Sequence, residues 1–393
     1  MEEARKIGRR RAARFVRLLL ALLALAPSSG CWDQDEVSNV GFILAAGMDA
    51  EKDDAVRLTI QVFVPNPTAG GGGDGGEGRV ITFTGSGPSV PEALGFIQNR
   101  VPRALSWDHA KMIIIGEALA SRGIKDEFDF LFRDIEPREQ ANFFVTRGHA
   151  REMLQSLNDP NSYDTIIRVS NMPQVSTYNM NYIEELMTGE ARAFVLPEAE
   201  TMTLLVSATP KQALTVKGMA VIKNGKLAGW IGEKDAQGMQ LGFQWLHPRK
   251  QGKNFAITIK EAGGKITAEL VGRKLRYVPR IENGEWKMTV RLRLDADIVQ
   301  NSSSIDLFDT PGALRALEPK FDDAIKELLR RPLNEVQGGL NADVLGFARA
   351  FHKKYPREWK QASGLWDEKF REVDVTLEVK CRLRKAGIAN LRT

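Results

Sequence analysis

Long stretches of alternating apolar and polar side chains constrain the fold of this chain more than any other feature. Two of them, 265–277 and 286–299, flank the turn signal Asn283-Gly284, and a third, 373–383, lies near the end of the chain. A period of two puts all the apolar side chains on one face of a strand. The last third of the chain therefore predicts long strands with one buried and one solvated face.

Helical patterns lie between these strands. One amphipathic helix carries an apolar face of Phe321, Ala324, Ile325, Leu328 and Leu329. A second is predicted to be capped by Asn341 and stopped by Pro356, with Val344, Ala348, Phe351 and Tyr355 facing inward. Together with a strand at 255–259, these elements predict an α+β C-terminal domain over 255–393.

Ahead of this domain, strands 219–223 and 226–231 flank Asn224-Gly225, the pair that favours the two positive φ angles of a type I′ turn. We expect residues 211–254 to form a small middle β-hairpin domain. Residues 31–210 alternate strand and helix patterns, including a capping box from Ser89 to Glu92, and predict a mixed α/β sheet covered by helices. The fold class is α+β, multidomain, with three domains of mixed and antiparallel sheets.

The glycine-rich segment 69–78 contains two overlapping Gly-x-Gly-x-x-Gly patterns. A glycine loop that binds phosphate must open into a helix, whereas the following residues, 79–84, read as a strand. The segment is interpreted as a solvated loop of a hairpin.

The first 30 residues have the pattern of a cleaved lipoprotein signal peptide. A basic tract precedes the apolar stretch 18–26, and the small residues Ser28-Ser29-Gly30 lie directly before Cys31. The apolar stretch is too short to span a membrane, which takes about 20 residues. We expect cleavage before Cys31 and a covalent diacylglycerol lipid on its thiol, the alternative being an ordinary secretory signal with an incidental cysteine.

Charge and cysteine usage agree with this division of the chain. Of 55 Lys and Arg and 50 Asp and Glu residues, residues 1–30 hold seven basic and two acidic ones, so 48 of each remain. The mature chain is formally neutral and shows no clustered basic segment, which argues against nucleic acid as a partner. Cys381 lies on the apolar side of a predicted strand and is expected to be a buried, unreactive thiol.

Strong catalytic signatures are missing from the sequence: it has no HExxH, no CxxC pair, no Walker loop and no GxSxG elbow. The densest polar cluster is Asp108, His109 and Lys111, ahead of an apolar strand. On a strand Asp108 and His109 would point to opposite faces, so we interpret them as partner-contact or structural residues and not as a catalytic pair. Asp33, Asp35 and Glu36 are read as a solvated tether and not as a metal site.

Several segments, in order along nearly the whole chain, resemble a known family. They are Gly30-Cys31-Trp32-Asp33, Gly47-Met48-Asp49, His109-Ala110-Lys111, Gly116-Glu117, the 218–229 hairpin, Asp343 to Phe347, Tyr355-Pro356 with Trp359, and Trp366. In this pattern the chain is similar to the C-subunit lipoproteins of bacterial spore germinant receptors, the Ger(x)C type. Ser28 and the insertion 69–78 depart from the pattern.

The resemblance implies a three-domain lipoprotein on the outer face of the spore inner membrane. It implies a multi-spanning A subunit and a transporter-like B subunit as partners, no enzymatic activity, and Cys31 as the lipid attachment point. The chain is accordingly expected to be a non-enzymatic receptor subunit needed for nutrient-triggered germination, without a cofactor or metal. Two alternatives stay open: a solute-binding lipoprotein of a transport system, and an envelope hydrolase.

Overall fold

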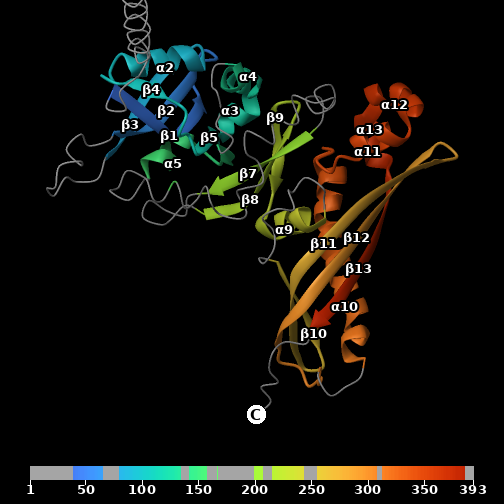
Figure 1. The fold of residues 1–393 in the computed structure, drawn as a ribbon. Helices are drawn as coiled ribbons and strands as arrows, with labels where there is room; N and C mark the ends of the chain where they lie inside the picture. Colours follow the sequence, from blue (N-terminus) through green and yellow to red (C-terminus); the bar gives the residue numbers. More distant parts are fainter. Residues whose placement is uncertain are drawn as a thin grey trace, which may run out of the picture. The chain divides into compact units, whose positions relative to one another are not determined.

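A computed structural model describes residues 39–64, 79–133, 141–156, 166, 199–206, 215–242, 255–307 and 312–385. Cys31 and the glycine-rich segment 69–78 lie outside these residues. Within them the strands form two sheets (Figure 1). No helix in these ranges is both long and apolar enough to cross a membrane.

The first sheet has the order β3-β2-β1-β5-β6-β7-β8-β9, with β4 paired to β1. Its central strands β1, β5, β6 and β7 run parallel, while β2, β3, β8 and β9 are joined by antiparallel pairing. The strands are β1 (Val40–Ala50), β2 (Val56–Val64), β3 (Arg79–Gly87), β4 (Ala104–Ser106), β5 (Met112–Gly116), β6 (Asn142–Thr146), β7 (Ala199–Val206), β8 (Thr215–Lys223) and β9 (Lys226–Ile231).

Helices cover both faces of this sheet, as the alternation along β5 requires. Ile113 and Ile115 pack in one core with α2 (Val90–Gln98), α3 (Glu117–Arg122) and α4 (Lys125–Arg133). Met112 and Ile114 pack in the other with α5 (Ala150–Gln155). The predicted mixed sheet is confirmed, and Ser89 caps α2 by accepting a hydrogen bond from the Glu92 amide.

The second sheet has the order β10-β11-β12-β13, formed by β10 (Ala256–Glu261), β11 (Gly264–Glu282), β12 (Glu285–Asn301) and β13 (Asp374–Lys385). Asn283 and Gly284 adopt φ angles of 54° and 82° and join β11 to β12 as an antiparallel pair. β13 returns parallel to β12, and Cys381 is buried on its core side. The predicted long strands and the buried thiol are therefore confirmed.

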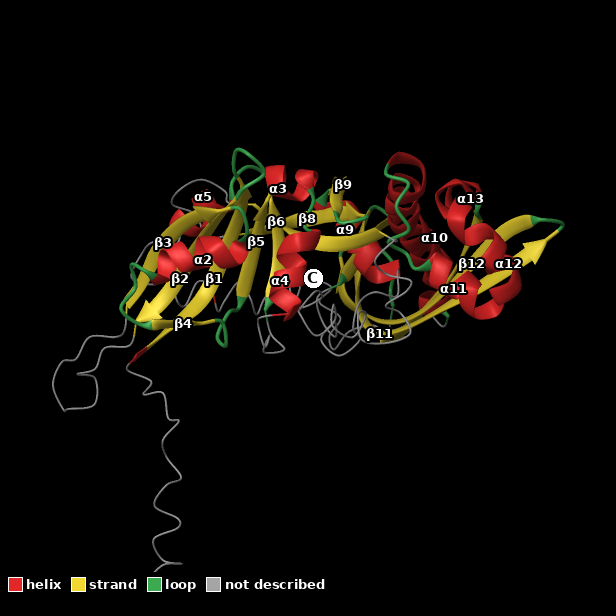
Figure 2. Cartoon of the chain, turned by 90° about the horizontal axis from the view of Figure 1, so that it is seen from above, coloured by secondary structure: helices red, strands yellow, loops and turns green. Residues whose placement is uncertain are grey.

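Helices pack against the apolar face of the second sheet (Figure 2). The long helix α10 (Ala313–Asn334) ends in a π-helical turn, η4 (Glu335–Gly339). It is followed by α11 (Phe347–Lys354), α12 (Pro356–Ala362), the 3-10 turn η5 (Ser363–Leu365) and α13 (Trp366–Glu372). Leu317, Phe321 and Ile325 of α10 are buried against the sheet.

The β8–β9 hairpin has the predicted type I′ geometry, since φ is 53° at Asn224 and 76° at Gly225. Its apolar side chains alternate between two cores. Ala220 and Ile222 pack with the residues of the first sheet, whereas Met219 and Val221 pack with the C-terminal helices and with α9 (Glu233–Gly242). The hairpin extends the first sheet through β7. The predicted boundaries at 210 and 254 lie outside the described residues and stay a prediction.

One predicted helix start is wrong. Asn341 does not cap α11, which begins at Phe347 after Gly346, a residue with φ of 75°. The carboxylate of Asp343 accepts hydrogen bonds from the amides of Phe347 and Ala348, so it supplies the cap. A charged acceptor that reaches two free amides displaces the neutral candidate five residues ahead of the true N-cap.

Candidate functional site

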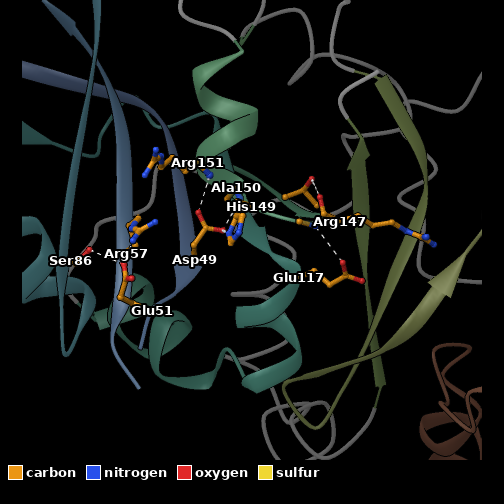
Figure 3. A network of polar contacts seen from close by, with 11 residues as sticks. Asp49, Glu51, Arg57, Ser86, Glu117, Arg147, His149, Ala150 and Arg151 are labelled. Atoms are coloured by element: carbon orange, nitrogen blue, oxygen red, sulfur yellow. Dashed lines mark hydrogen bonds and ion pairs between the residues drawn. The ribbon is translucent and has the colours of Figure 1, made fainter. Parts of the chain in front are cut away.

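Ligands of open α/β sheets bind at the carboxyl ends of the parallel strands, and polar side chains gather there in the first sheet. Asp49 lies one residue before the end of β1, Gly116 ends β5 and Glu117 begins α3, and the loop after β6 runs from Arg147 to His149, directly before Ala150 of α5 (Figure 3). We call Asp49, Glu117 and this loop the carboxylate clasp.

Asp49 is the buried member of the clasp, with 3% of its surface exposed. Its Oδ1 accepts a hydrogen bond from the Ala150 amide at 2.7 Å, and its Oδ2 accepts one from the Arg151 amide at 2.9 Å. These amides begin α5, whose own N-cap residue, His149, makes no capping hydrogen bond with its side chain. Asp49 therefore supplies both the acceptor and the negative charge that a helix N-terminus favours.

Two glycines make room for this arrangement. A Cβ on Gly116 would lie 2.1 Å from Asp49 Oδ1, and a Cβ on Gly47 would meet Ala150 Cβ at 3.1 Å. The Gly-x-Asp and Gly-Glu segments of the sequence thus serve one purpose, which is the close approach of β1, β5 and α5.

Glu117 ties the same loop to a different strand. Its Oε2 accepts from the Gly148 amide at 3.3 Å, and its Oε1 accepts from the Trp230 indole of β9 at 3.2 Å. The guanidinium of Arg147 lies over the Trp230 ring, 5.2 Å from its centroid, a distance that allows a cation–π interaction. Beside the clasp, Glu51 binds Arg57 at 2.5 Å and accepts from Ser86 at 3.2 Å.

The carboxylates of the clasp make structural hydrogen bonds. All four carboxylate oxygens of Asp49 and Glu117 accept from backbone amides or from an indole. His149 is 55% exposed, but its Nδ1 lies 3.7 Å from Asp49 Oδ1, beyond hydrogen-bond distance. Among the described residues no group of three His, Cys, Asp or Glu side chains could hold a metal ion. The clasp fixes strands and a helix.

A second buried carboxylate organises the C-terminal helices. Asp343 accepts from the Phe347 amide at 3.0 Å, from the Ala348 amide at 2.7 Å and from the Trp366 indole at 3.0 Å. Burial raises the pKa of its carboxyl group, an effect that these hydrogen bonds oppose. The rings of Trp286, Phe351 and Trp359 pack around Trp366, with their centroids 4.9 to 5.8 Å from its own.

The residues interpreted from the sequence as partner-contact or structural residues, Asp108, His109 and Lys111, lie elsewhere. They precede β5, whereas the clasp follows it, so the structure does not bring the two sets together. Asp108 and His109 are exposed in a turn closed by the Ala110 amide and the Trp107 carbonyl, so the premise that they sit on a strand is wrong. The His109 ring packs edge-on against Phe42 with centroids 4.7 Å apart. Lys111 hydrogen-bonds Leu44 and Asn142 through its backbone.

The clasp itself was not predicted as a site. Asp49 and Glu117 appeared in the sequence only as parts of short segments without an assigned role. A charged residue at the end of an apolar strand pattern was the available signal, because such a residue needs a buried partner.

Two family models match consecutive parts of this chain. Residues 33–201 match the model described as the spore germination protein N-terminal domain, and residues 217–387 match the one described as spore germination B3/GerAC like, C-terminal. The chain is 23% identical over 395 residues to spore germination protein KC of Bacillus subtilis (strain 168), covering 95% of this chain and 96% of that protein. It is also 23% identical over 383 residues to spore germination protein B3 of the same organism, covering 96% and 98%.

Among solved structures, the chain is similar to the crystal structure of the GerBC protein. The TM-score is 0.56 at 18% sequence identity, and the match covers 89% of this chain and 99% of that one. The similarity supports the multidomain α+β fold.

Proposed function

The chain belongs to the Ger(x)C family, the C subunits of spore germinant receptors, and we propose that it acts there as a non-enzymatic, lipid-anchored docking subunit. In this role it would work with a multi-spanning A subunit and a transporter-like B subunit. Nutrient-triggered germination would depend on the assembly and not on any reaction at this chain.

One observation carries the non-enzymatic part of the proposal. The buried carboxylates of Asp49 and Asp343, together with Glu117, are occupied by backbone amides and indoles. A general acid or base needs a free position within hydrogen-bond reach of its substrate. Carboxylates bound in this way support the fold and leave the exposed surface for partners.

The anchor part of the proposal rests on Cys31 and the signal pattern before it. Acyl chains contribute about 0.8 kcal/mol per buried CH₂, and stable anchoring takes more than one chain, which a diacylglycerol thioether supplies. The anchor would hold the mature chain on the outer face of the spore inner membrane.

Cys31→Ala tests the anchor. We expect the variant to leave the membrane fraction when it is expressed without partner subunits, because no thioether can form. Cys381→Ala is the matched control, since this thiol is buried in the second sheet and should not affect retention. Retention of the Cys31→Ala protein in the membrane pellet would contradict the anchor.

Two further measurements separate the alternatives. Thermal stabilisation of the purified chain by candidate nutrients would favour a solute-binding protein. Turnover in a broad hydrolase screen would favour an enzyme. Co-purification of the chain with both other receptor subunits, with neither of these signals, is the result expected of a docking subunit.

A further inference from the structure

The exposed face of the second sheet has a charge arrangement that neither the clasp nor the anchor uses. Lys274 of β11 lies directly opposite Arg293 of β12, and Arg293 lies directly opposite Lys380 of β13. One step along the same face, Arg276 lies opposite Arg291. We call these five residues the cationic band.

The strand register fixes the side on which the band lies. The residues that alternate with it, Leu275, Leu292 and Val379, pack in the core beneath α10. Side chains of successive residues in a strand point to opposite faces, so the band faces away from α10, except that the amine of Lys380, on the edge strand β13, reaches Asp322 of α10 at 3.9 Å. Lys274, Arg276 and Arg293 are exposed, and the Lys380 side chain is 84% exposed.

The band differs from the rest of its own face. Toward one end, Arg382 pairs with Asp295 at 2.8 Å and Arg384 pairs with Asp297 at 3.2 Å. Toward the other, Lys287 lies 3.1 Å from Glu285. Among the residues that the structure describes, no carboxylate pairs with Lys274, Arg276 or Arg293; within the band, Arg291 binds Glu378 and Lys380 lies 3.9 Å from Asp322.

Such an arrangement weakens the sheet. Like charges directly opposite each other on neighbouring strands are destabilising, and here three cations lie in one row across three strands. The sequence predicted that basic residues are not clustered, and this prediction is wrong for the folded chain. The cations are separated along the sequence and are brought into rows by the strand register.

We propose that the cationic band is the docking site for an acidic segment of a partner protein that lies across β11, β12 and β13. Neighbouring strands are about 4.8 Å apart, so the row from Lys274 to Lys380 spans about 10 Å, and the two rows are about 6.7 Å apart. Carboxylates on one side of a short helix or extended segment have matching separations.

Charge complementarity favours a narrow partner over a planar one. A flat anionic membrane would meet Asp295, Asp297 and Glu378 together with the cations, because all three lie on the same face. A segment that follows the band meets mainly unpaired cations. The inference does not depend on the proposed anchor or on the identity of the other receptor subunits.

Arg293→Glu is the test substitution, with Lys265→Glu as its matched control. Lys265 also lies on a strand directly opposite a cation, Lys260, but outside the band. Both substitutions make the same change in net charge, and each replaces a repulsive cross-strand contact with an attractive one. Both variants should therefore have a melting temperature equal to or above that of the wild-type chain.

The probe is a fluorescein-labelled decaglutamate peptide, titrated by fluorescence anisotropy with the purified full-length chain in detergent at about 50 mM salt, where the Debye length exceeds 10 Å. Wild-type chain and Lys265→Glu should bind equally, and Arg293→Glu should weaken binding by about tenfold or more. Raising the salt concentration should weaken binding by the wild-type chain.

The decaglutamate and melting experiments would overturn the proposal in three ways: no binding by the wild-type chain, equal losses in both variants, or a lower melting temperature in Arg293→Glu and in Arg293→Gln, which would make Arg293 structural. Vesicles containing phosphatidylglycerol and single-stranded DNA are tested in parallel. If Arg293→Glu abolishes binding to either of these while decaglutamate binding is unchanged, the band serves a membrane or a nucleic acid and the proposal fails.

Discussion

Two buried aspartates, one in each sheet region, each cap the N-terminus of a helix. The sequence distance between the aspartate and its helix differs greatly between the two. Asp343 caps α11, which begins four residues later, and also binds Trp366. Asp49 caps α5, about 100 residues further along the chain. One cap forms within a local segment, whereas the other exists only after β1, β5 and β6 have paired.

The two aspartates differ in the number of donors that they bind and in how well water can reach their surroundings. Asp343 has three donors and sits among aromatic rings, so its removal leaves more buried groups unsatisfied. Asp49 has two donors beside the half-exposed His149, where water can replace part of what is lost.

Asp343→Ala should produce the largest loss of stability. It leaves two buried amides and one indole without an acceptor, and we expect a cost of about 3 to 5 kcal/mol in the free energy of unfolding. Denaturant unfolding of the purified chain measures it. Asp323→Ala, a control on the exposed side of α10 with only a surface ion pair to Lys326, should cost less than about 0.5 kcal/mol.

Asp49→Ala should cost about 2 to 3 kcal/mol, less than Asp343→Ala, because fewer donors are left unsatisfied. A larger loss of stability for Asp49→Ala than for Asp343→Ala would contradict the idea that the number of unsatisfied donors sets the cost. Gly116→Ala should destabilise through the same contact, since its Cβ would displace Asp49 Oδ1.

A double-mutant cycle of Gly116→Ala and Asp49→Ala tests whether Gly116 acts through Asp49. If Gly116→Ala acts by displacing Asp49, the two substitutions together should cost clearly less than the sum of their separate effects. Additive costs would show that Gly116 acts elsewhere. Gly95→Ala in α2 is the control: its Cβ meets nothing within 4 Å, and the substitution should stabilise the helix by up to about 1 kcal/mol.

The pH dependence of stability should separate the wild-type chain from Asp343→Asn. Burial raises the pKa of Asp343 above the value of about 3.9 that it has when unfolded. Between these two values the folded state binds more protons, so stability falls as the pH rises through this window. The isosteric variant cannot titrate. The stability of the wild-type chain relative to Asp343→Asn should therefore decline from about pH 4 upward until the folded-state pKa is passed, as measured by unfolding at several pH values.

His109→Ala should have the smallest effect on stability among the substitutions at the predicted and candidate sites, about 0.5 to 1 kcal/mol, because it loses one edge-on ring contact with Phe42 at an exposed turn. We nevertheless predict impaired germination, through lost assembly or folding. Germination assays are compared with co-purification of the other receptor subunits. Abolished germination with normal assembly and unchanged stability would count against docking and reopen a chemical role for this turn.

Much of the fold could be read from local patterns. The strands flanking Asn224-Gly225 and Asn283-Gly284, the capping box at Ser89 and the core-facing Cys381 follow from two-residue periodicity and turn geometry, which depend on neighbouring residues only. Asn341 was assigned a cap for the same kind of reason, and the prediction was wrong because Asp343 offers a stronger acceptor.

The candidate sites could not be predicted in this way. His109 was assigned to a strand that begins only at Met112, so its exposure and its contact with Phe42 were missed. Asp49 and Glu117 had no visible partners, because their donors lie in a loop that follows another strand.

The sequence by itself determined which segments are strands and helices, which face of each is apolar, and how the hairpins turn, because these depend on periodicity and on backbone conformations of single residues. Tertiary structure alone decided that Asp49 caps α5 and that Lys274, Arg293 and Lys380 form one row. Both depend on the pairing order and register of strands far apart in the chain. A shift of one residue in that register would turn each side chain to the opposite face of its sheet.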